Sequence, residues 1–108
     1  MKTKFALLAT VFLLAFEVQA ADINCGGHIS FVMADHPGCS GNLAFKTEAT
    51  GGAGGIWMCT RSKEGNSVVI ASMLDDRTVL VYIEGSDVGG VCTQLPNYRA
   101  ISYVIINP

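Results

Sequence analysis

Residues 68–84 read VVIASMLDDRTVLVYIE, and their hydrophobic spacing changes within one short turn. Over the first half the spacing is helical, because Val69, Ile70, Met73 and Leu74 fall within a single arc of a helical wheel. From residue 78 onward the spacing is that of a strand, with residues 79, 81 and 83 on one face. An amphipathic helix that leads directly into a largely apolar strand builds a core. The other segments are therefore placed by asking what packs against this unit.

Three shorter strands are predicted before this unit, at residues 28–33, 43–47 and 56–60. Turn residues around Pro37 separate the first two strands, and the glycine-rich segment 50–55 separates the second from the third. We expect the second and third strands to form a hairpin. The glycine-rich segment has much conformational freedom, so we expect its tip to be mobile or ordered by a partner.

Asn66 or Ser67 is predicted to be the N-cap of the helix, which begins at Val68 and runs for about ten residues. It ends at Asp75 and Asp76, which carry the wrong charge for the negative end of a helix dipole. Adjacent carboxylates on a helix or turn diverge, so a shared proton or metal ion is disfavoured. The favoured interpretation is a solvated turn in which Arg77 offsets part of the charge.

The C-terminal segment 99–106 is predicted to be the last strand, and it is apolar on both faces. Ile101, Tyr103 and Ile105 alternate with Ser102, Val104 and Ile106. A small antiparallel sheet normally exposes one face to water, so the sheet either curls or is covered by another subunit. The order β-β-β-α-β-β favours a β-rich α+β fold, either a small five-stranded barrel of the oligonucleotide/oligosaccharide-binding kind or a curled sheet, with one short helix. An open α+β sheet is the alternative.

The first twenty residues have the three-part pattern of a secretory signal peptide. Two lysines precede an apolar run from Phe5 to Phe16. The small residues Val18 and Ala20 occupy the two positions before the cleavage site that a signal peptidase recognises. The run is shorter than the roughly twenty residues that a transmembrane helix needs. We therefore predict cleavage after Ala20, one small domain over residues 21–108, no membrane span, and a secreted or periplasmic location. An uncleaved anchor is the alternative.

Four cysteines lie in this domain, namely Cys25, Cys39, Cys59 and Cys92. An even number in a small exported chain is typical of disulfides, and each would add about 3–4 kcal/mol of stability. Three pairings are possible, and the sequence does not choose between them. We favour Cys25–Cys39 with Cys59–Cys92, in which the second bridge ties a strand to the loop after the central unit. A zinc site is disfavoured because the sequence has no CxxC pair.

The composition argues against nucleic acid as a partner. Without Lys2, Lys4 and Glu17, five basic and eight acidic side chains remain, a formal net charge of −3. Binding to phosphates needs a basic surface, which this charge does not provide.

No catalytic, metal or cofactor site is predicted. His28 and His36 lie near the N-terminal end of the domain with Asp35 beside His36, but no nucleophile can be placed next to them, so solvated loop histidines are the favoured interpretation. The glycine run 51–55 lacks the lysine and the strand–loop–helix context of a phosphate loop. We therefore predict that the protein is not an enzyme and holds no cofactor.

The second half of the chain combines a strand that ends in a cysteine (56–59), a short helix (68–76), a strand (78–84), a loop with Cys92, and a closing strand (101–106). This order resembles the small B subunits of bacterial AB5 toxins, particularly the subtilase-cytotoxin and pertussis-like branch. The resemblance covers these segments alone and rests on element order, cysteine placement and size. It implies a secreted barrel that assembles into a pentameric ring and binds host glycans. No sugar-binding motif matches, so no binding residue is assigned.

Three functional hypotheses follow. The first is a secreted, non-catalytic binding module, specifically a glycan-binding, toxin-B-subunit-like protein that forms homo-oligomers. The alternative is a small secreted inhibitor or protein-interaction protein that uses the glycine-rich segment or the acidic turn, and a hydrolase that depends on His36 ranks last. Trp57 could stack on a sugar, but its place two residues before Cys59 favours packing against a disulfide.

Overall fold

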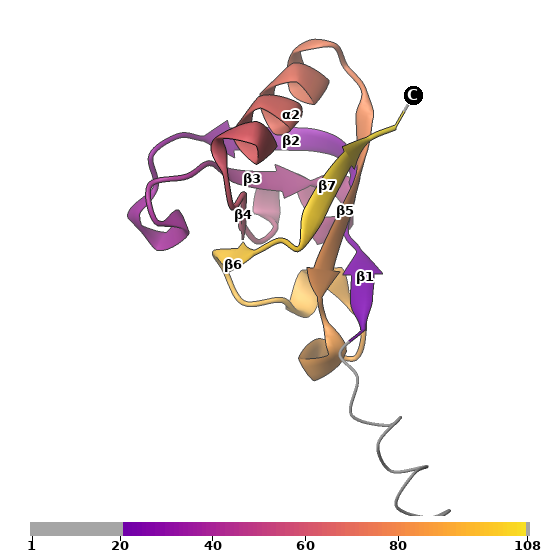
Figure 1. Ribbon diagram of the computed structural model, residues 1–108. Coiled ribbons are helices and arrows are strands. Elements are labelled where there is room, and N and C mark those ends of the chain that lie inside the picture. Colours follow the sequence, from indigo (N-terminus) through magenta and orange to yellow (C-terminus); the bar gives the residue numbers. More distant parts are fainter. Residues whose placement is uncertain (1–20, 108) are drawn as a thin grey trace, which may run out of the picture.

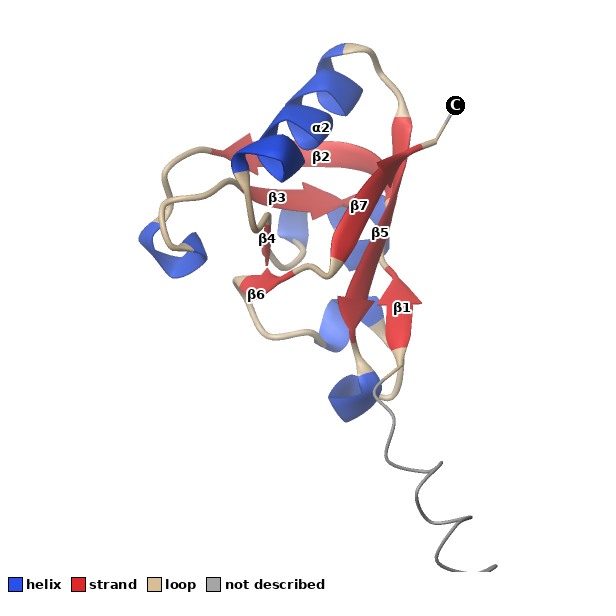
Figure 2. Cartoon of the chain, viewed as in Figure 1, coloured by secondary structure: helices blue, strands red, loops and turns tan. Residues whose placement is uncertain are grey.

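The computed structural model describes residues 21–107 (Figure 1), so the predicted signal peptide lies outside the described residues. Within this range the chain forms one α-helix and a seven-stranded sheet. The strands are β1 (Asp22–Asn24), β2 (Gly27–Met33), β3 (Ala44–Thr47), β4 (Met58–Cys59), β5 (Thr78–Glu84), β6 (Arg99–Ala100) and β7 (Tyr103–Ile106), and the helix is α2 (Lys63–Leu74). Short 3-10 helices occupy Pro37–Cys39, Glu48–Thr50, Gly52–Gly54, Ser86–Val88 and Cys92–Gln94 in the connections (Figure 2).

The strands form one curled, mixed sheet in the order β1-β5-β2-β3-β4-β6, and β7 pairs with the other edge of β5. Strand β2 joins the two halves of the curl, because Gly27 and His28 pair with β5 while the rest of the strand pairs with β3. Helix α2 lies over β2 and beside β7 (Figure 1). The predicted β-rich α+β fold, a curled sheet with one helix and two disulfides, is confirmed.

The strand that follows the helix has the predicted bounds, and one of its two predicted faces is buried. Val79, Val81 and Ile83 are each at most 1 % exposed, because the period-two pattern turns them all toward the helix side of the sheet. The expected hairpin of β3 and β4 also forms, with Ala44 opposite Cys59 and Phe45 opposite Met58. The core cluster consists of Cys25, Leu43, Phe45, Met58, Val69, Val79, Val81, Ile83, Leu95 and Ile101.

The helix begins earlier than predicted and buries a different face. Its N-cap is Ser62, whose hydroxyl accepts a hydrogen bond from the Gly65 amide at 3.1 Å, so the predicted caps at residues 66 and 67 are wrong. The helix buries Val69 and Ser72, whereas the predicted apolar arc is largely outside, with Leu74 80 % exposed. Ser72 is fully buried, at 0 % exposed. Ser72 is satisfied there by donating to the carbonyl of Val68 at 2.7 Å.

The predicted last strand is broken in two. Ile101 donates its amide to the carbonyl of Cys59 at 2.9 Å, and the next residue, Ser102, donates to Tyr82 at 2.7 Å. The chain therefore crosses from β4 to β5 within one peptide. As a result Ile101 is 3 % exposed while Tyr103 is 50 % exposed, and the prediction that they share a face is wrong.

The disulfides are Cys25–Cys92 and Cys39–Cys59, so the pairing that we favoured from the sequence is wrong. The reason is β1, a strand that the sequence did not predict. It runs along β5, and the amide of Cys25 donates to Val81 of β5 at 2.7 Å, which places Cys25 beside the loop that follows β5. Cys39 then pairs with Cys59, because the β3–β4 hairpin places Cys59 next to the turn of residues 36–42.

Candidate functional site

A surface cavity of about 230 Å³ lies against the Cys39–Cys59 disulfide. We call it the disulfide pocket. Three separate segments line it: the turn after β2, the end of β4 with the residues that follow it, and the start of β6. The lining residues are Gly38, Cys39, Ser40, Asn42, Cys59, Thr60, Arg61, Tyr98 and Ala100.

The turn that forms one wall of the pocket is closed by its own hydrogen bonds. His36 caps the 3-10 helix Pro37–Cys39, because its Nδ1 accepts from the Gly38 amide at 2.9 Å. The carbonyl of His36 accepts from the amides of Cys39 and Gly41, each at 3.0 Å, and its amide donates to the carbonyl of Asn42 at 3.2 Å. One histidine therefore holds the turn through both its backbone and its side chain.

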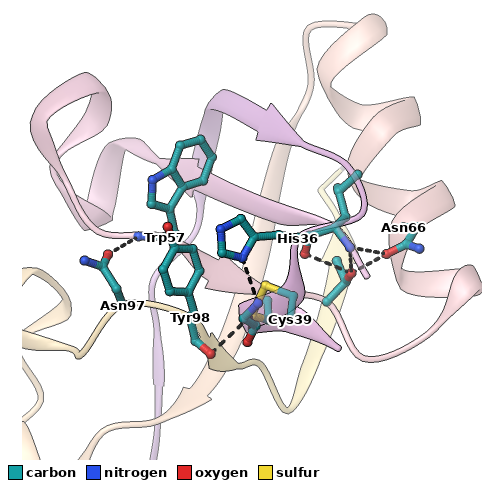
Figure 3. The surroundings of a disulfide bond; sticks show 10 residues. His36, Cys39, Trp57, Asn66, Asn97 and Tyr98 are labelled. Atoms are coloured by element: carbon teal, nitrogen blue, oxygen red, sulfur yellow. Dashed lines mark hydrogen bonds between the residues drawn. A yellow bond between two sulfur atoms is a disulfide. The ribbon is translucent and has the colours of Figure 1, made fainter. Parts of the chain in front are cut away.

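The opposite wall is Tyr98, which stacks on His36 with 4.2 Å between the ring centroids and an interplanar angle of 14° (Figure 3). Its backbone has φ 65°, in the left-handed region. Such a conformation costs a non-glycine residue of order 1–3 kcal/mol, and strain of this kind clusters at functional sites. Asp35 (φ 57°) and Ser40 (φ 55°) lie in the turn opposite. Two of the four non-glycine residues with positive φ in the described chain, Ser40 and Tyr98, thus line this pocket.

The floor of the pocket is tied to the helix. Thr60 is 1 % exposed, and its hydroxyl oxygen accepts from the amide of Leu43 at 3.1 Å. Asn66 of α2 also accepts from this amide, at 3.2 Å, and pairs with the Thr60 hydroxyl (Figure 3). The N-terminal turn of α2 therefore fixes the segment that carries Arg61, whose exposed guanidinium makes no ion pair with any described residue.

Trp57 stands next to Tyr98 (Figure 3) and packs against the Cys39–Cys59 bridge, as predicted. Its amide donates to the side-chain oxygen of Asn97 at 2.9 Å, and the Lys46 ammonium lies 4.6 Å from its ring centroid. Lys46 is only 9 % exposed and also donates to the carbonyl of Ala53 at 3.1 Å. These contacts hold the glycine-rich segment without a partner.

A charged clamp holds the Tyr98 segment from the other side. Arg99 donates two hydrogen bonds of 2.7 Å to the carboxylate of Asp87 and one of 3.0 Å to the carbonyl of Glu84. The Arg99 hydrogen bond lowers the pKa of Asp87, and Asp87 in turn raises the pKa of Arg99. Hydrogen bonds from the hydroxyl and amide of Ser86 lower the pKa of Glu84.

Asp87→Asn is expected to flatten the acid side of the stability profile. Because Arg99 lowers the pKa of Asp87 in the folded protein, the stabilisation is present above the ordinary aspartate pKa of about 3.9 and is lost as the pH falls through the lower folded value. Urea unfolding between about pH 5 and pH 2 should show a shallower loss of stability in D87N than in wild type. Arg99→Gln should give the same shallow slope, and a wild-type slope in both variants would contradict the assignment.

The structure separates the histidines that the sequence singled out. His36 is at the pocket, half-buried rather than solvated. His28 is exposed, with Nδ1 2.8 Å from Glu48 and Nε2 4.0 Å from Asp76. Asp75 and Asp76 form the predicted solvated turn, and Arg77 pairs with Asp75 at 2.6 Å. Sequence reasoning missed the pocket residues because their neighbours are distant in the chain. The pair Asn97-Tyr98 before a short strand is the only local signal.

In the part of the chain that the structure describes, no three histidine, cysteine, aspartate or glutamate side chains are placed to hold a metal ion, and all four cysteines are in disulfides. None of the described helices is long and apolar enough to cross a membrane.

Comparisons with known proteins give no relative. No family model matches the chain, and no curated protein or solved structure matches it significantly. The resemblance to toxin B subunits therefore stays a prediction, and the function has to be argued from the pocket and the surface.

Proposed function

We propose that this protein is a secreted, non-catalytic module that binds glycans in the disulfide pocket and works as a homo-oligomer, like the toxin B subunits that it resembles. The observation that carries the proposal is the composition of the pocket. An aromatic ring, hydroxyl and amide groups and one guanidinium surround it, and its lining includes no carboxylate.

These groups suit a sugar. A pyranose ring offers an apolar C–H face and a rim of hydroxyl groups, so it needs an aromatic surface and convergent polar side chains. Tyr98 provides the aromatic surface, and the polar side chains are those of Ser40, Asn42 and Arg61. The volume of about 230 Å³ lies below the roughly 300–1,000 Å³ of pockets for drug-sized ligands, which favours a single sugar unit.

The pocket is also preorganised. A disulfide, the His36–Tyr98 stack and the Arg99–Asp87 clamp fix its walls. Binding then costs little ordering of side chains, which favours affinity for a small ligand. The two disulfides fit an oxidising compartment, and export by the signal-like segment is part of the proposal.

The proposed oligomer uses the outer face of β5 and β7, which we call the assembly surface: Leu80, Tyr82, Tyr103 and Ile105. Leu80 lies opposite Ile105 and Tyr82 opposite Tyr103, so all four share one face. The two tyrosine rings stack with their centroids 4.8 Å apart, and Ile105 is 45 % exposed. In the described chain β7 pairs with β5 alone. The second edge of β7 has no strand partner among the described residues, and an apolar edge strand favours pairing with another chain.

Tyr98→Gly is expected to lose glycan binding while the fold is kept. Glycine adopts a φ of 65° without strain, which offsets part of the lost packing, whereas the aromatic surface disappears. On a printed array of mammalian and bacterial glycans, the signal of Tyr98→Gly should fall at least about tenfold, equivalent to about 1.4 kcal/mol. Tyr98→Phe keeps the ring and should bind like wild type.

Two outcomes would contradict the proposal. One is wild-type protein that binds no glycan on the array, and the other is Tyr98→Gly protein that binds as well as wild type. Recovery of a specific protein from host or periplasmic extract in the first case would instead support the interaction-protein alternative.

A further inference from the structure

The cap that His36 places on its own turn requires a neutral imidazole. Its Nδ1 accepts a hydrogen bond from the Gly38 amide at 2.9 Å. In a protonated histidine both ring nitrogens are donors, so protonation would direct an N–H group at the N–H group of Gly38. Histidine is the side chain that ordinarily gains its proton between about pH 8 and pH 5.

The packing between this cap, Gly38 and Tyr98 is tight. A methyl group placed on Gly38 would lie 3.0 Å from Nδ1 of His36 and 3.0 Å from Cγ of Tyr98. The turn, the imidazole and the tyrosine ring are therefore in tight contact. The imidazole is thus the contact that links the Gly38 turn to Tyr98, and both are walls of the disulfide pocket.

The surrounding charges do not compensate the protonated ring. The titratable or charged groups on the segments around it are Asp35, which precedes it in the chain, the Tyr98 phenol, Arg61 of the pocket lining and Lys46 above Trp57. Among the described residues no carboxylate lies within 4.0 Å of the imidazole of His36.

His28 provides the opposite case within the same chain. Its two ring nitrogens face the carboxylates of Glu48 and Asp76 at 2.8 and 4.0 Å. Protonation of His28 therefore strengthens ion pairs, whereas protonation of His36 removes a hydrogen bond. The two histidines should respond to acid with opposite effects on their surroundings.

We propose that protonation of His36 opens the turn of residues 36–42 and so dismantles one wall of the disulfide pocket. The consequence for ligand rests on the proposed function: a glycan bound near neutral pH is released on acidification. The step consists of the uptake of one proton and needs no other reactant.

The opening of the turn is tested first on the unliganded protein, with the proton as the only probe. Nitrogen NMR should show His36 as the neutral tautomer protonated at Nε2 at pH 7.5. On titration to pH 5.5, the Gly38 amide should lose its hydrogen-bonded chemical shift and its protection from exchange, in step with His36. A Gly38 amide that stays unchanged while His36 becomes protonated would overturn the proposal.

His36→Asn is the matched variant. The side-chain oxygen of asparagine is as many bonds from Cα as Nδ1 of histidine, and asparagine is a preferred N-cap that does not titrate in this range. The Gly38 amide in this variant should be insensitive to pH between 7.5 and 5.5. His28→Asn removes the other histidine and should retain the wild-type transition.

Binding is then measured on the same printed glycan array at both pH values, as the ratio of the two signals. Wild type and His28→Asn should lose at least threefold of their signal at pH 5.5, and His36→Asn should lose none. An equal loss in His36→Asn would overturn the link to this residue. No signal at pH 7.5 would contradict the proposed glycan binding only, because the NMR transition decides the turn opening independently.

Discussion

Removal of the Cys25–Cys92 bridge is expected to lower the free energy of unfolding by about 4 kcal/mol, because the bridge closes a loop with a sequence separation of 67. The Cys39–Cys59 bridge, with a separation of 20, should contribute about 3 kcal/mol. Both values are large beside the roughly 5–15 kcal/mol that stabilises an ordinary domain. A domain of this size buries little surface, so either loss brings it close to unfolding at body temperature.

The measurement is urea unfolding of the double variants Cys25→Ala/Cys92→Ala and Cys39→Ala/Cys59→Ala beside wild type. Alanine is the right replacement at Cys25, which is fully buried, because serine would add an unsatisfied hydroxyl. Peptide mapping without reduction should recover the two bridges directly. A larger loss in the second variant than in the first, or a map with Cys25 joined to Cys39, would contradict the assignment.

The two bridges should also differ in their effect on binding. Cys39 and Cys59 line the disulfide pocket, whereas Cys25 and Cys92 do not. At a temperature where both variants remain folded, only the variant without Cys39–Cys59 should lose its signal on the glycan array. A comparison of the two variants thus separates the stability of the domain from the integrity of the pocket.

The sequence was sufficient for the central strand, β5, whose pattern is long and regular, but not for the equally regular segment 99–106, which is broken in two. The seven residues of β5 alternate without interruption, and the bounds of the strand and the residues that share each face were predicted correctly. The helix shows the limit of such patterns. Its buried face carries Val69 and the polar Ser72, and Asn66 accepts a hydrogen bond from the amide of Leu43. A hydrophobic pattern carries no information about any of these contacts.

The acidic turn after the helix, which sequence reasoning left unexplained, has a structural role. Asp76 has φ 52°, and the amide of Arg77 reaches back to the carbonyl of Ser72 at 2.8 Å. This is the left-handed C-cap by which many helices end, and aspartate tolerates that conformation better than most residues. Part of the charge of the pair is offset by Arg77, which pairs with Asp75.

Neither the pairing of the cysteines nor the pocket could be predicted from the sequence, and the reason is the same for both. Both depend on strands of two or three residues that pair far along the chain: β1 with β5, and β4 with β6 in parallel. Segments this short have no periodicity to detect. Tyr98 reaches the pocket only through the β4–β6 pairing, since its amide donates to Trp57 at 2.8 Å.

Ile105→Lys is expected to convert the oligomer into a monomer. Ile105 lies on the assembly surface and on the free edge strand, so a lysine there removes apolar contact and hinders pairing of β7 with a second chain. The isolated subunit should tolerate the change, because the side chain is 45 % exposed. Light scattering during gel filtration should give a multiple of the subunit mass for wild type and one subunit mass for Ile105→Lys.

Leu74→Lys is the matched control. Leu74 is the most exposed large apolar side chain of the described residues, at 80 %, but it lies on α2 rather than on the assembly surface. Its replacement by lysine makes the same chemical change, so it should leave the mass of the oligomer unaltered. Wild-type protein that is monomeric at every concentration would contradict the proposal, as would an Ile105→Lys protein that keeps its wild-type mass.

A comparison of Ile105→Lys with Tyr98→Gly links assembly to function. The disulfide pocket is small, so a single copy should bind a sugar weakly. Several copies in the proposed oligomer would raise the effective concentration of pockets, and such avidity can exceed the affinity of one site by about 10²–10⁴. Ile105→Lys should therefore lose most of its signal on a densely printed array while it retains its affinity for the same glycan free in solution. Tyr98→Gly should lose both, which distinguishes a damaged pocket from a dispersed oligomer.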